Sequence, residues 1–299
     1  MNLLKELAKI KDIYKEGKNI IAYIKNRTDS ENNSLESIMI SYDFQAGSYI
    51  DYCNNHPEYI DKYTQALANV INGLGTHDSI LEAGVGEATT LANTILKLNS
   101  LPPSVFGFDI SWSRIKFGKG YIEKKNIPDV QLFTADMFNI RLPDNSVDVV
   151  YTSHSIEPNG GKEREALTEL YRVANKYLVL LEPAYEFASE EAKARMLSHN
   201  YATKLYETAL DLGYNITEHR LFDISSNPLN PTGLIIIKKE LDNPLEIPVL
   251  SCPITKKPLE KIRNCYYSSY SLLAYPIIDD VPCLLPDNAI IATHFMDNI

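Results

Sequence analysis

The chain has few cysteines and no long apolar run. Its 299 residues include four cysteines, too few to staple a chain of this size, and no C-x-x-C pair occurs. We therefore expect reduced thiols and no metal site. No run of about 18 apolar residues occurs, so the sequence predicts no membrane span. The charged start of the chain lacks the apolar core of a signal peptide, and we expect a soluble, cytoplasmic protein.

The chain also has fewer basic than acidic residues. The chain has 29 basic and 39 acidic residues, which gives a net charge of −10. Such a chain lacks the overall field that attracts nucleic acid, so nucleic acid is not the expected partner. The clearest basic run, residues 114–125, is expected to be a solvated helix face. With 44% hydrophobic residues, the chain can bury one large core and a small second module.

Residues 79–90 are the most informative segment that is present. An apolar run ends in Glu82 and is followed by a turn of small residues. The run predicts the end of a buried strand, Gly84 and Gly86 let the backbone turn tightly against a ligand, and a helix is expected from Thr89. In the dinucleotide-binding fingerprint the acidic residue comes after the next strand. Here the acid precedes the turn, which suits a cationic ligand better than a diphosphate.

Polar side chains follow three further expected strands, at residues 105–109, 130–135 and 147–152. Asp109 ends the first of them, where a carboxylate can accept both hydroxyls of a ribose. Asp136 and Met137 follow the second and form a natural edge for an adenine ring. Ser153 and His154 follow the third. Strand ends that carry polar residues in series are typical of a ligand site at the carboxyl edge of a parallel sheet.

These motifs resemble the class I S-adenosylmethionine-dependent methyltransferases. The resemblance rests on residues 81–88, Asp109, residues 135–137 and residues 142–150, and covers roughly residues 40–240. One departure is Ala88, which stands where the family usually has a third glycine. The resemblance implies S-adenosylmethionine as cofactor, with a site formed by Tyr42, Tyr49, Glu82, Gly84, Gly86, Asp109, Ile110, Asp136, Met137 and Ser153.

By the family's pattern, each part of this site would face one part of the cofactor. Glu82 and the glycine turn would face the methionine part, Asp109 the ribose, and Asp136 with Met137 the adenine. Tyr42 and Tyr49 lie in a segment that often closes over the cofactor in such enzymes. Packing of these two tyrosines against the sheet edge is the alternative.

The resemblance also implies a fold. We expect an α/β protein with a Rossmann-like, seven-stranded sheet, helices on both faces, and a last pair of strands that run antiparallel. Residues 1–37 are expected to form an amphipathic helix, interrupted at Gly17, and a polar linker. The helix also offers a surface for forming a homo-oligomer. Residues 38–243 would be the methyltransferase domain, and residues 244–299 a small β-rich module.

Two side chains are candidates for the catalytic chemistry. Methyl transfer is an in-line displacement, so the protein must position donor and acceptor and, for a hydroxyl acceptor, remove a proton. His154 lies where the methyl group should point, and Glu157 follows it. His154 is either the general base or a histidine that shapes the pocket without proton transfer.

Residues 244–299 resemble a small zinc-ribbon-like family that includes the activator subunit of eukaryotic methyltransferases. In that family the module often begins with a C-x-x-C pair. Here Cys252 is followed by Thr255 at the second cysteine position, and we expect the fold without zinc. The module is expected to dock on the methyltransferase domain, although a tethered, independent module is the alternative.

Three functions are compatible with the sequence. The favoured one is methyl transfer to a small-molecule acceptor, such as a sugar, a nucleotide-linked sugar or another metabolite, at oxygen. A tRNA or rRNA methyltransferase is the second, suggested by the resemblance of residues 244–299. The third is a non-catalytic cofactor-binding scaffold.

Overall fold

A seven-stranded sheet lies at the centre of the computed structural model, which describes residues 3–28, 34–240 and 248–297. The strand order is β3-β2-β1-β4-β5-β7-β6. The strands are β1 (Ser79–Ala83), β2 (Ser104–Asp109), β3 (Val130–Thr134), β4 (Val147–Ser153), β5 (Ala174–Pro183), β6 (Asn215–Leu221) and β7 (Thr232–Lys238).

The strands run in the directions expected from the sequence. β1 pairs in parallel with β2 and β4, whereas β7 is antiparallel to both β5 and β6. Every residue of β1 is buried, as expected for a parallel strand covered on both faces. The predicted Rossmann-like, seven-stranded sheet is therefore confirmed. Its parallel strands bring their carboxyl ends to one edge, where loops can hold a ligand.

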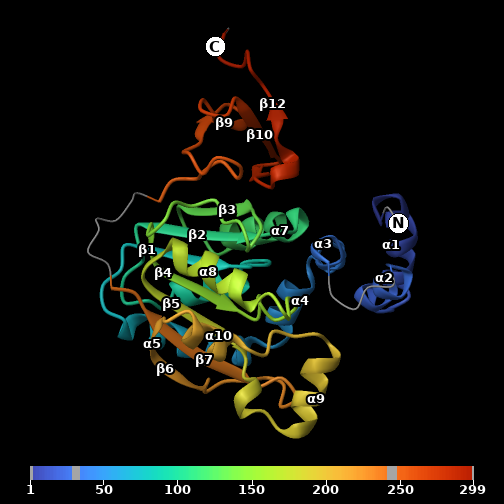
Figure 1. Cartoon of the computed structure of the whole chain (residues 1–299), viewed down its shortest axis with the longest axis vertical. Helices are drawn as coiled ribbons and strands as arrows, with labels where there is room; N and C mark the ends of the chain where they lie inside the picture. Colours follow the sequence, from blue (N-terminus) through green and yellow to red (C-terminus); the bar gives the residue numbers. More distant parts are fainter. Residues whose placement is uncertain (1–2, 29–33, 241–247, 298–299) are drawn as a thin grey trace.

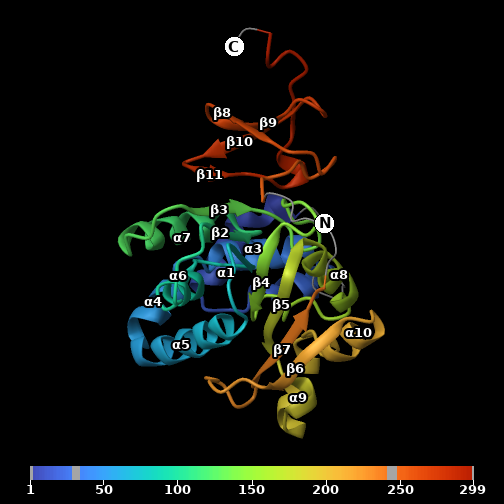
Figure 2. The same cartoon turned by 90° about the vertical axis from the view of Figure 1, so that its left-hand side faces the viewer.

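Helices cover both faces of this sheet (Figures 1 and 2). One face is packed by α5 (Pro57–Gly73), α6 (Thr89–Ile95) and α7 (Trp112–Lys124), and the other by α8 (Glu163–Val173) and α10 (Leu205–Asp211). The apolar side chains of the two helix layers belong to two separate buried clusters, divided by the sheet. None of the described helices is long and apolar enough to cross a membrane.

The N-terminal segment contains two helices rather than one. A short 3-10 turn (Leu3–Glu6) leads into α1 (Leu7–Lys15), and α2 (Ile20–Thr28) follows after a turn at Gly17, whose φ is +72°. Residues 29–33 of the predicted linker lie outside the described residues, and α3 begins at Leu35, inside the predicted linker. Ile10 of α1 and two buried isoleucines of α2, Ile20 and Ile24, pack with one another and with Ile40 of α3. Self-association through these helices stays a prediction.

The small module has its own antiparallel sheet (Figure 1). It contains β8 (Glu260–Ile262), β9 (Cys265–Ser268), β10 (Leu273–Ile278), β11 (Val281–Pro282) and β12 (Ile290–Ile291). The module lies against β3: Thr134 bridges Cys283, and the Thr134 hydroxyl accepts a hydrogen bond from the Leu284 amide at 3.0 Å. Docking on the central sheet, as expected from the sequence, is therefore seen in the structure.

The cysteines of the module are dispersed. The Cys252 thiol lies 3.3 Å from the Tyr275 hydroxyl in the buried interior, and Cys265 and Cys283 lie on separate strands or loops. Within residues 3–28, 34–240 and 248–297, no three His, Cys, Asp or Glu side chains come together in a way that could hold a metal ion. The likeness to the zinc-ribbon-like family stays a prediction.

Candidate functional site

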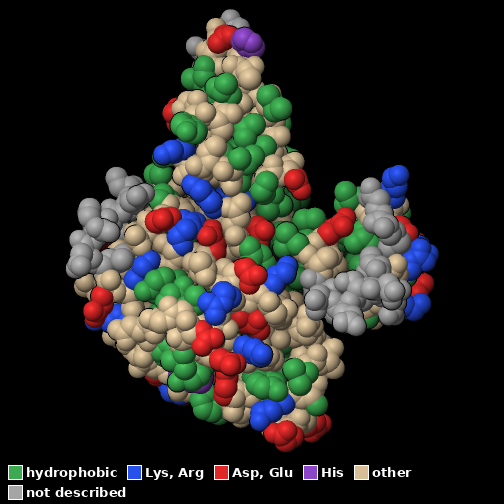
Figure 3. Space-filling view, viewed as in Figure 1, with side chains coloured by type: hydrophobic (Ala, Val, Ile, Leu, Met, Phe, Trp, Pro, Cys, Tyr) green, Lys and Arg blue, Asp and Glu red, His purple; other side chains and the backbone are tan. Residues whose placement is uncertain are grey.

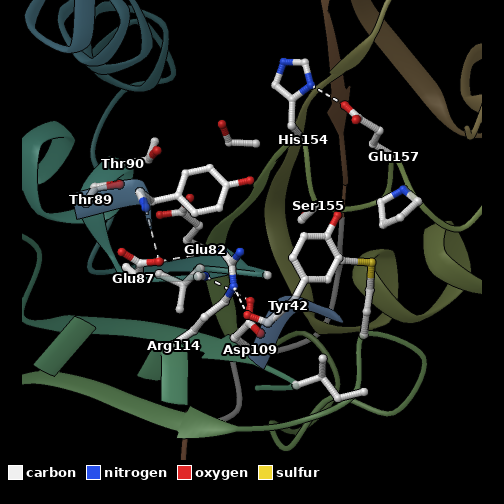
Figure 4. Close-up of a pocket in the computed structure, with 18 of the residues that line it drawn as sticks. Tyr42, Glu82, Glu87, Thr89, Thr90, Asp109, Arg114, His154, Ser155 and Glu157 are labelled. Atoms are coloured by element: carbon white, nitrogen blue, oxygen red, sulfur yellow. Dashed lines mark hydrogen bonds and ion pairs between the residues drawn. The ribbon is translucent and has the colours of Figure 1, made fainter. Parts of the chain in front are cut away.

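A cavity of about 470 Å³ lies beyond the carboxyl ends of the parallel strands. Every residue predicted for the site lines it: Tyr42, Tyr49, Glu82, Gly84, Gly86, Asp109, Ile110, Asp136, Met137, Ser153, His154 and Glu157. Asp109 and Tyr42 lie toward one side of the close-up, and His154 and Glu157 toward the other (Figure 4). The sequence therefore locates residues that the fold brings together from four strand ends and from α3 (Leu35–Phe44) and α4 (Ser48–Asn55).

The glycine turn makes room for a second loop. Gly84 has a φ of +71°, and a Cβ atom on it would lie 2.3 Å from the Cβ of Ser155. The Ser155 hydroxyl donates a hydrogen bond to the Ala83 carbonyl at 2.7 Å, which fixes the two loops together. Only glycine permits both this backbone conformation and this close approach. The turn after β1 and the loop after β4 thus form one continuous wall.

Ala88, which departs from the family's pattern, adopts the left-handed conformation with a φ of +55°. The Cβ of Ala88 faces Gly118 of α7. If Gly118 carried a Cβ, the two Cβ atoms would lie 3.3 Å apart. A glycine on the facing helix therefore provides the space that a third glycine in the turn would provide. This explains why the fold tolerates alanine here.

Glu82 is the buried acid at the end of β1. Its side chain accepts a hydrogen bond from the Tyr151 hydroxyl at 2.9 Å, and the residue is 2% exposed. Burial raises the pKa of Glu82 to about 8, because the charged form has lost its water. A cation in the cavity would favour ionised Glu82, so this position suits a positively charged ligand.

Asp109 is held in place by backbone amides. Its two carboxylate oxygens accept hydrogen bonds from the Gly86 amide at 3.0 Å and the Ser111 amide at 2.9 Å. A carboxylate has about four acceptor positions, so Asp109 keeps capacity to accept further hydrogen bonds from a ligand. Burial raises the pKa of Asp109, although the nearby Arg114 opposes the shift.

The residues after β3 form the opposite edge. Asp136 accepts a hydrogen bond from the Phe138 amide at 3.0 Å, which closes a tight turn. Met137 is 9% exposed and presents part of its side chain to the cavity. Ile110, after β2, lines the same cavity. An apolar residue from each of two neighbouring strand ends therefore lines the cavity together with Asp136.

Arg114 is the exception to the interpretation of the basic run as a solvated face, because Lys124 and Lys125 are exposed but Arg114 is not. Its side chain is 3% exposed and lies over the rings of Tyr42 and Tyr49, with guanidinium-to-centroid distances of 4.8 and 4.5 Å. Nε donates a hydrogen bond to the Tyr42 carbonyl at 3.0 Å, whereas Nη2 is buried without a partner. Charge pattern alone does not reveal that the first turn of α7 faces α3, so the sequence missed this residue.

His154 uses both ring nitrogens in contacts with protein side chains. Nδ1 lies 2.8 Å from a Glu157 carboxylate oxygen, and Nε2 lies 2.8 Å from the Thr232 hydroxyl. Burial alone would lower the pKa of His154, but the hydrogen bond and the charge of Glu157 outweigh burial and raise it. Burial acts against ionised Glu157 as well, and the contacts with His154 and Asn230 nevertheless lower its pKa.

Glu182, at the end of β5, is a positioning residue that the sequence missed. Its carboxylate accepts hydrogen bonds from the amides of Ser155, Ile156 and Glu157, at 3.0 to 3.1 Å. Burial raises the pKa of Glu182 to about 7. The available signal was an acid at the end of the fifth strand, but its contact with the loop after β4 required the fold.

Residues 80–176 match a family model described as "Methyltransferase domain". No curated protein sequence matches the chain.

Solved structures with a similar fold include magnesium protoporphyrin IX methyltransferase from Synechocystis PCC 6803, with 12% identity and a TM-score of 0.49 over 78% of this chain and 99% of the other. A methyltransferase from Aquifex aeolicus has 17% identity and a TM-score of 0.45, and the match covers 57% of this chain and 87% of the other. Geranyl diphosphate C-methyltransferase from Streptomyces coelicolor A3(2) has 12% identity and a TM-score of 0.47, and the match covers 58% of this chain and 80% of the other.

Proposed function

We propose that this chain, which carries an S-adenosylmethionine-dependent methyltransferase domain, transfers the methyl group to an oxygen of a small-molecule acceptor. The observation that carries the proposal is the single cavity that joins Glu82 and Asp109 on one side to His154 and Glu157 on the other. A donor and an acceptor held in one cavity of this size can be brought into line.

The residues present fit the cofactor. S-adenosylmethionine supplies a methyl group activated by a sulfonium cation. Buried Glu82 would face the positively charged methionine part, and Asp109 has free acceptor positions for the ribose hydroxyls. Ile110 and Met137 would contact the adenine, with Asp136 accepting a hydrogen bond at its edge. The unpartnered Nη2 of Arg114 would bind the carboxylate of the methionine part.

His154 acts in this proposal as a positioning residue. Direct transfer of an acceptor proton to Nε2 would require the contact with Thr232 to break, and Nδ1 is engaged by Glu157. With a φ of +54°, His154 also sets the course of the loop that carries Ser155 and Glu157. The Glu182 carboxylate fixes this loop, and the loop orients the acceptor side of the cavity. The rate enhancement would therefore come mainly from the alignment of methyl donor and acceptor.

A nucleic-acid acceptor is the second candidate, because residues 244–299 resemble a methyltransferase activator. A continuous basic groove leading to His154 would favour it. On the face shown in Figure 3, the Lys and Arg side chains of the described residues are interspersed with Asp and Glu. This pattern gives no support to a nucleic-acid track on that face.

Binding and transfer can be measured separately. Calorimetry with S-adenosylmethionine tests the cofactor site, with Asp109→Ala as the variant and the exposed, distant Glu260→Gln as control. Labelled cofactor is then incubated with a small-molecule extract and, in parallel, with tRNA and rRNA, and mass spectrometry identifies the product. We expect label in small molecules. Label in RNA would favour the second candidate, and binding without transfer would favour the scaffold.

A further inference from the structure

We propose that the methyl acceptor carries an anionic oxygen group, a carboxylate or a phosphate, which is bound by Arg195. The inference rests on the proposed function and adds the chemical class of the acceptor. Arg195 lies on α9 (Glu190–Ser198), which follows β5, and it lines the same cavity as His154 and Glu157.

The guanidinium of Arg195 has an unused donor inside the protein. Its Nη1 atom is buried and has no hydrogen-bond partner. Among the Asp and Glu side chains that the structure describes, none forms an ion pair with Arg195. Buried donors are nearly always satisfied in folded proteins, and the half-buried charge of Arg195 has no acidic partner of its own among these residues. A ligand with anionic oxygens would supply both the missing acceptor and the missing charge.

The surroundings hold Arg195 in position without neutralising it. Its guanidinium lies 5.6 Å from the centre of the Tyr201 ring, and the Tyr201 hydroxyl interacts with both Arg195 and Glu157. Glu157 is already engaged, because it contacts His154 at 2.8 Å and accepts a hydrogen bond from Asn230 Nδ2 at 3.0 Å. The carboxylate of this network is therefore already engaged by His154 and Asn230.

Asn230 provides a second requirement for the ligand. While its Nδ2 donates to Glu157, its Oδ1 is buried without a partner. This oxygen can only accept a hydrogen bond, so it calls for a donor such as a hydroxyl. Arg195 and Asn230 together fit an acid that also carries a hydroxyl group, the acceptor atom assumed in the proposed function.

Arg114, the other cavity arginine with an unpartnered nitrogen, differs in its electrostatic setting. Its Nη1 lies 4.0 Å from Glu87, and Asp109 is close enough for Arg114 to affect its pKa. Arg114 therefore belongs to the cofactor side, where carboxylates balance its charge. Arg195 is the arginine that is available on the acceptor side.

The test compares charged and neutral probes of similar shape. Three tyrosines, Tyr52, Tyr59 and Tyr63, line the cavity, so aromatic probes are suitable: benzoate, phenyl phosphate and neutral benzamide. Each is titrated by calorimetry into the full chain saturated with S-adenosylhomocysteine, which binds without turnover. The variants are Arg195→Met and, as control, Lys193→Met, which removes a positive charge from the same helix but does not line the cavity.

We expect wild type and Lys193→Met to bind one of the two anions about 10- to 100-fold more tightly than benzamide, the range typical of a hydrogen bond to a charged group. Arg195→Met should lose this preference and keep its affinity for the cofactor. The favoured anion distinguishes a carboxylate from a phosphate. Equal affinities in wild type, including no detectable binding of either anion, would overturn the inference. Failure of the wild-type protein to bind the cofactor would instead refute the proposed function.

Discussion

Protonation of Glu82 should oppose cofactor binding in a way that can be measured. In the cavity without ligand, burial raises the pKa of Glu82 to about 8. Glu82 is thus about nine-tenths protonated at pH 7. A sulfonium and an ammonium group beside it would favour the carboxylate and lower its pKa. Binding at pH 7 should therefore release close to one proton per cofactor molecule.

The size of the effect follows from the pKa difference. Suppose that the cofactor returns the pKa of Glu82 to its ordinary value near 4.5. The cost of deprotonating Glu82 then makes cofactor binding at pH 7 about tenfold weaker than at a pH well above 8, a difference of about 1.4 kcal/mol. The affinity should rise about tenfold per pH unit below pH 8 and level off above it. The same raised pKa makes the cofactor-free protein less stable as pH rises from about 4.5 to 8, because the folded state holds the extra proton.

Calorimetry in buffers of different ionisation enthalpy gives the number of protons released. Glu82→Gln is the matched variant, since its amide oxygen can still accept the hydrogen bond from Tyr151. The Glu82→Gln variant should bind the cofactor without releasing the proton of Glu82, and its affinity should lose the corresponding pH dependence. Any proton release by Glu182, whose pKa is about 7, remains in both proteins. Equal proton release by wild type and Glu82→Gln at pH 7 would refute the reasoning.

Three further substitutions test the site. Asp109→Ala should weaken cofactor binding about a hundredfold, through the loss of hydrogen bonds worth about 1.5–3 kcal/mol each, and unchanged affinity in calorimetry would reject the ribose role. Gly84→Ala should lower the melting temperature and cofactor affinity, because its Cβ would lie 2.3 Å from that of Ser155; a wild-type melting curve would contradict this. His154→Asn should retain much of the turnover rate, since an amide can keep hydrogen bonds to Glu157, and a loss of about 10²-fold or more would favour a general base.

The strand ends of the site could be predicted because local sequence determines them. The apolar run before Glu82, the glycines after it and Asp109 at the end of the next run together specify parallel strands with a ligand site at one edge. The structure adds the physical reason for the glycine at position 84, which is the approach of Ser155. The hydrogen bond that holds Ser155 there reaches the carbonyl of Ala83, 72 positions earlier in the chain, and no local pattern reveals it.

The remaining site residues depend on contacts between distant segments. Arg114 belongs to a run whose composition is typical of a solvated face, yet its Nε bonds to the carbonyl of Tyr42, 72 residues away. Glu182 fixes a loop 25 to 27 residues earlier in the chain. A sequence pattern gives residue types along one element, whereas burial of a charged group depends on which element covers it.

The module at the C-terminal end is connected to the predicted adenine side of the cavity. The loop that begins with Asp136 continues to Asn139 and Arg141, and both contact the module. Arg141 is fully buried and donates from Nε to the Leu284 carbonyl at 2.7 Å, while its own carbonyl accepts from the Ser251 amide at 2.8 Å.

Burial lowers the pKa of Arg141 to about 10, although the charges of Asp136 and others oppose the shift, and the hydrogen bond from its Nε goes to the module. Without the module, the Arg141 guanidinium would regain water and the carbonyl would lose its partner, and the loop would lose the contacts that restrict it. Because Asp136 and Met137 lie on the same loop, we infer that the module stabilises the predicted adenine side of the cavity. This is a physical reason for joining such a module to the methyltransferase domain in one chain.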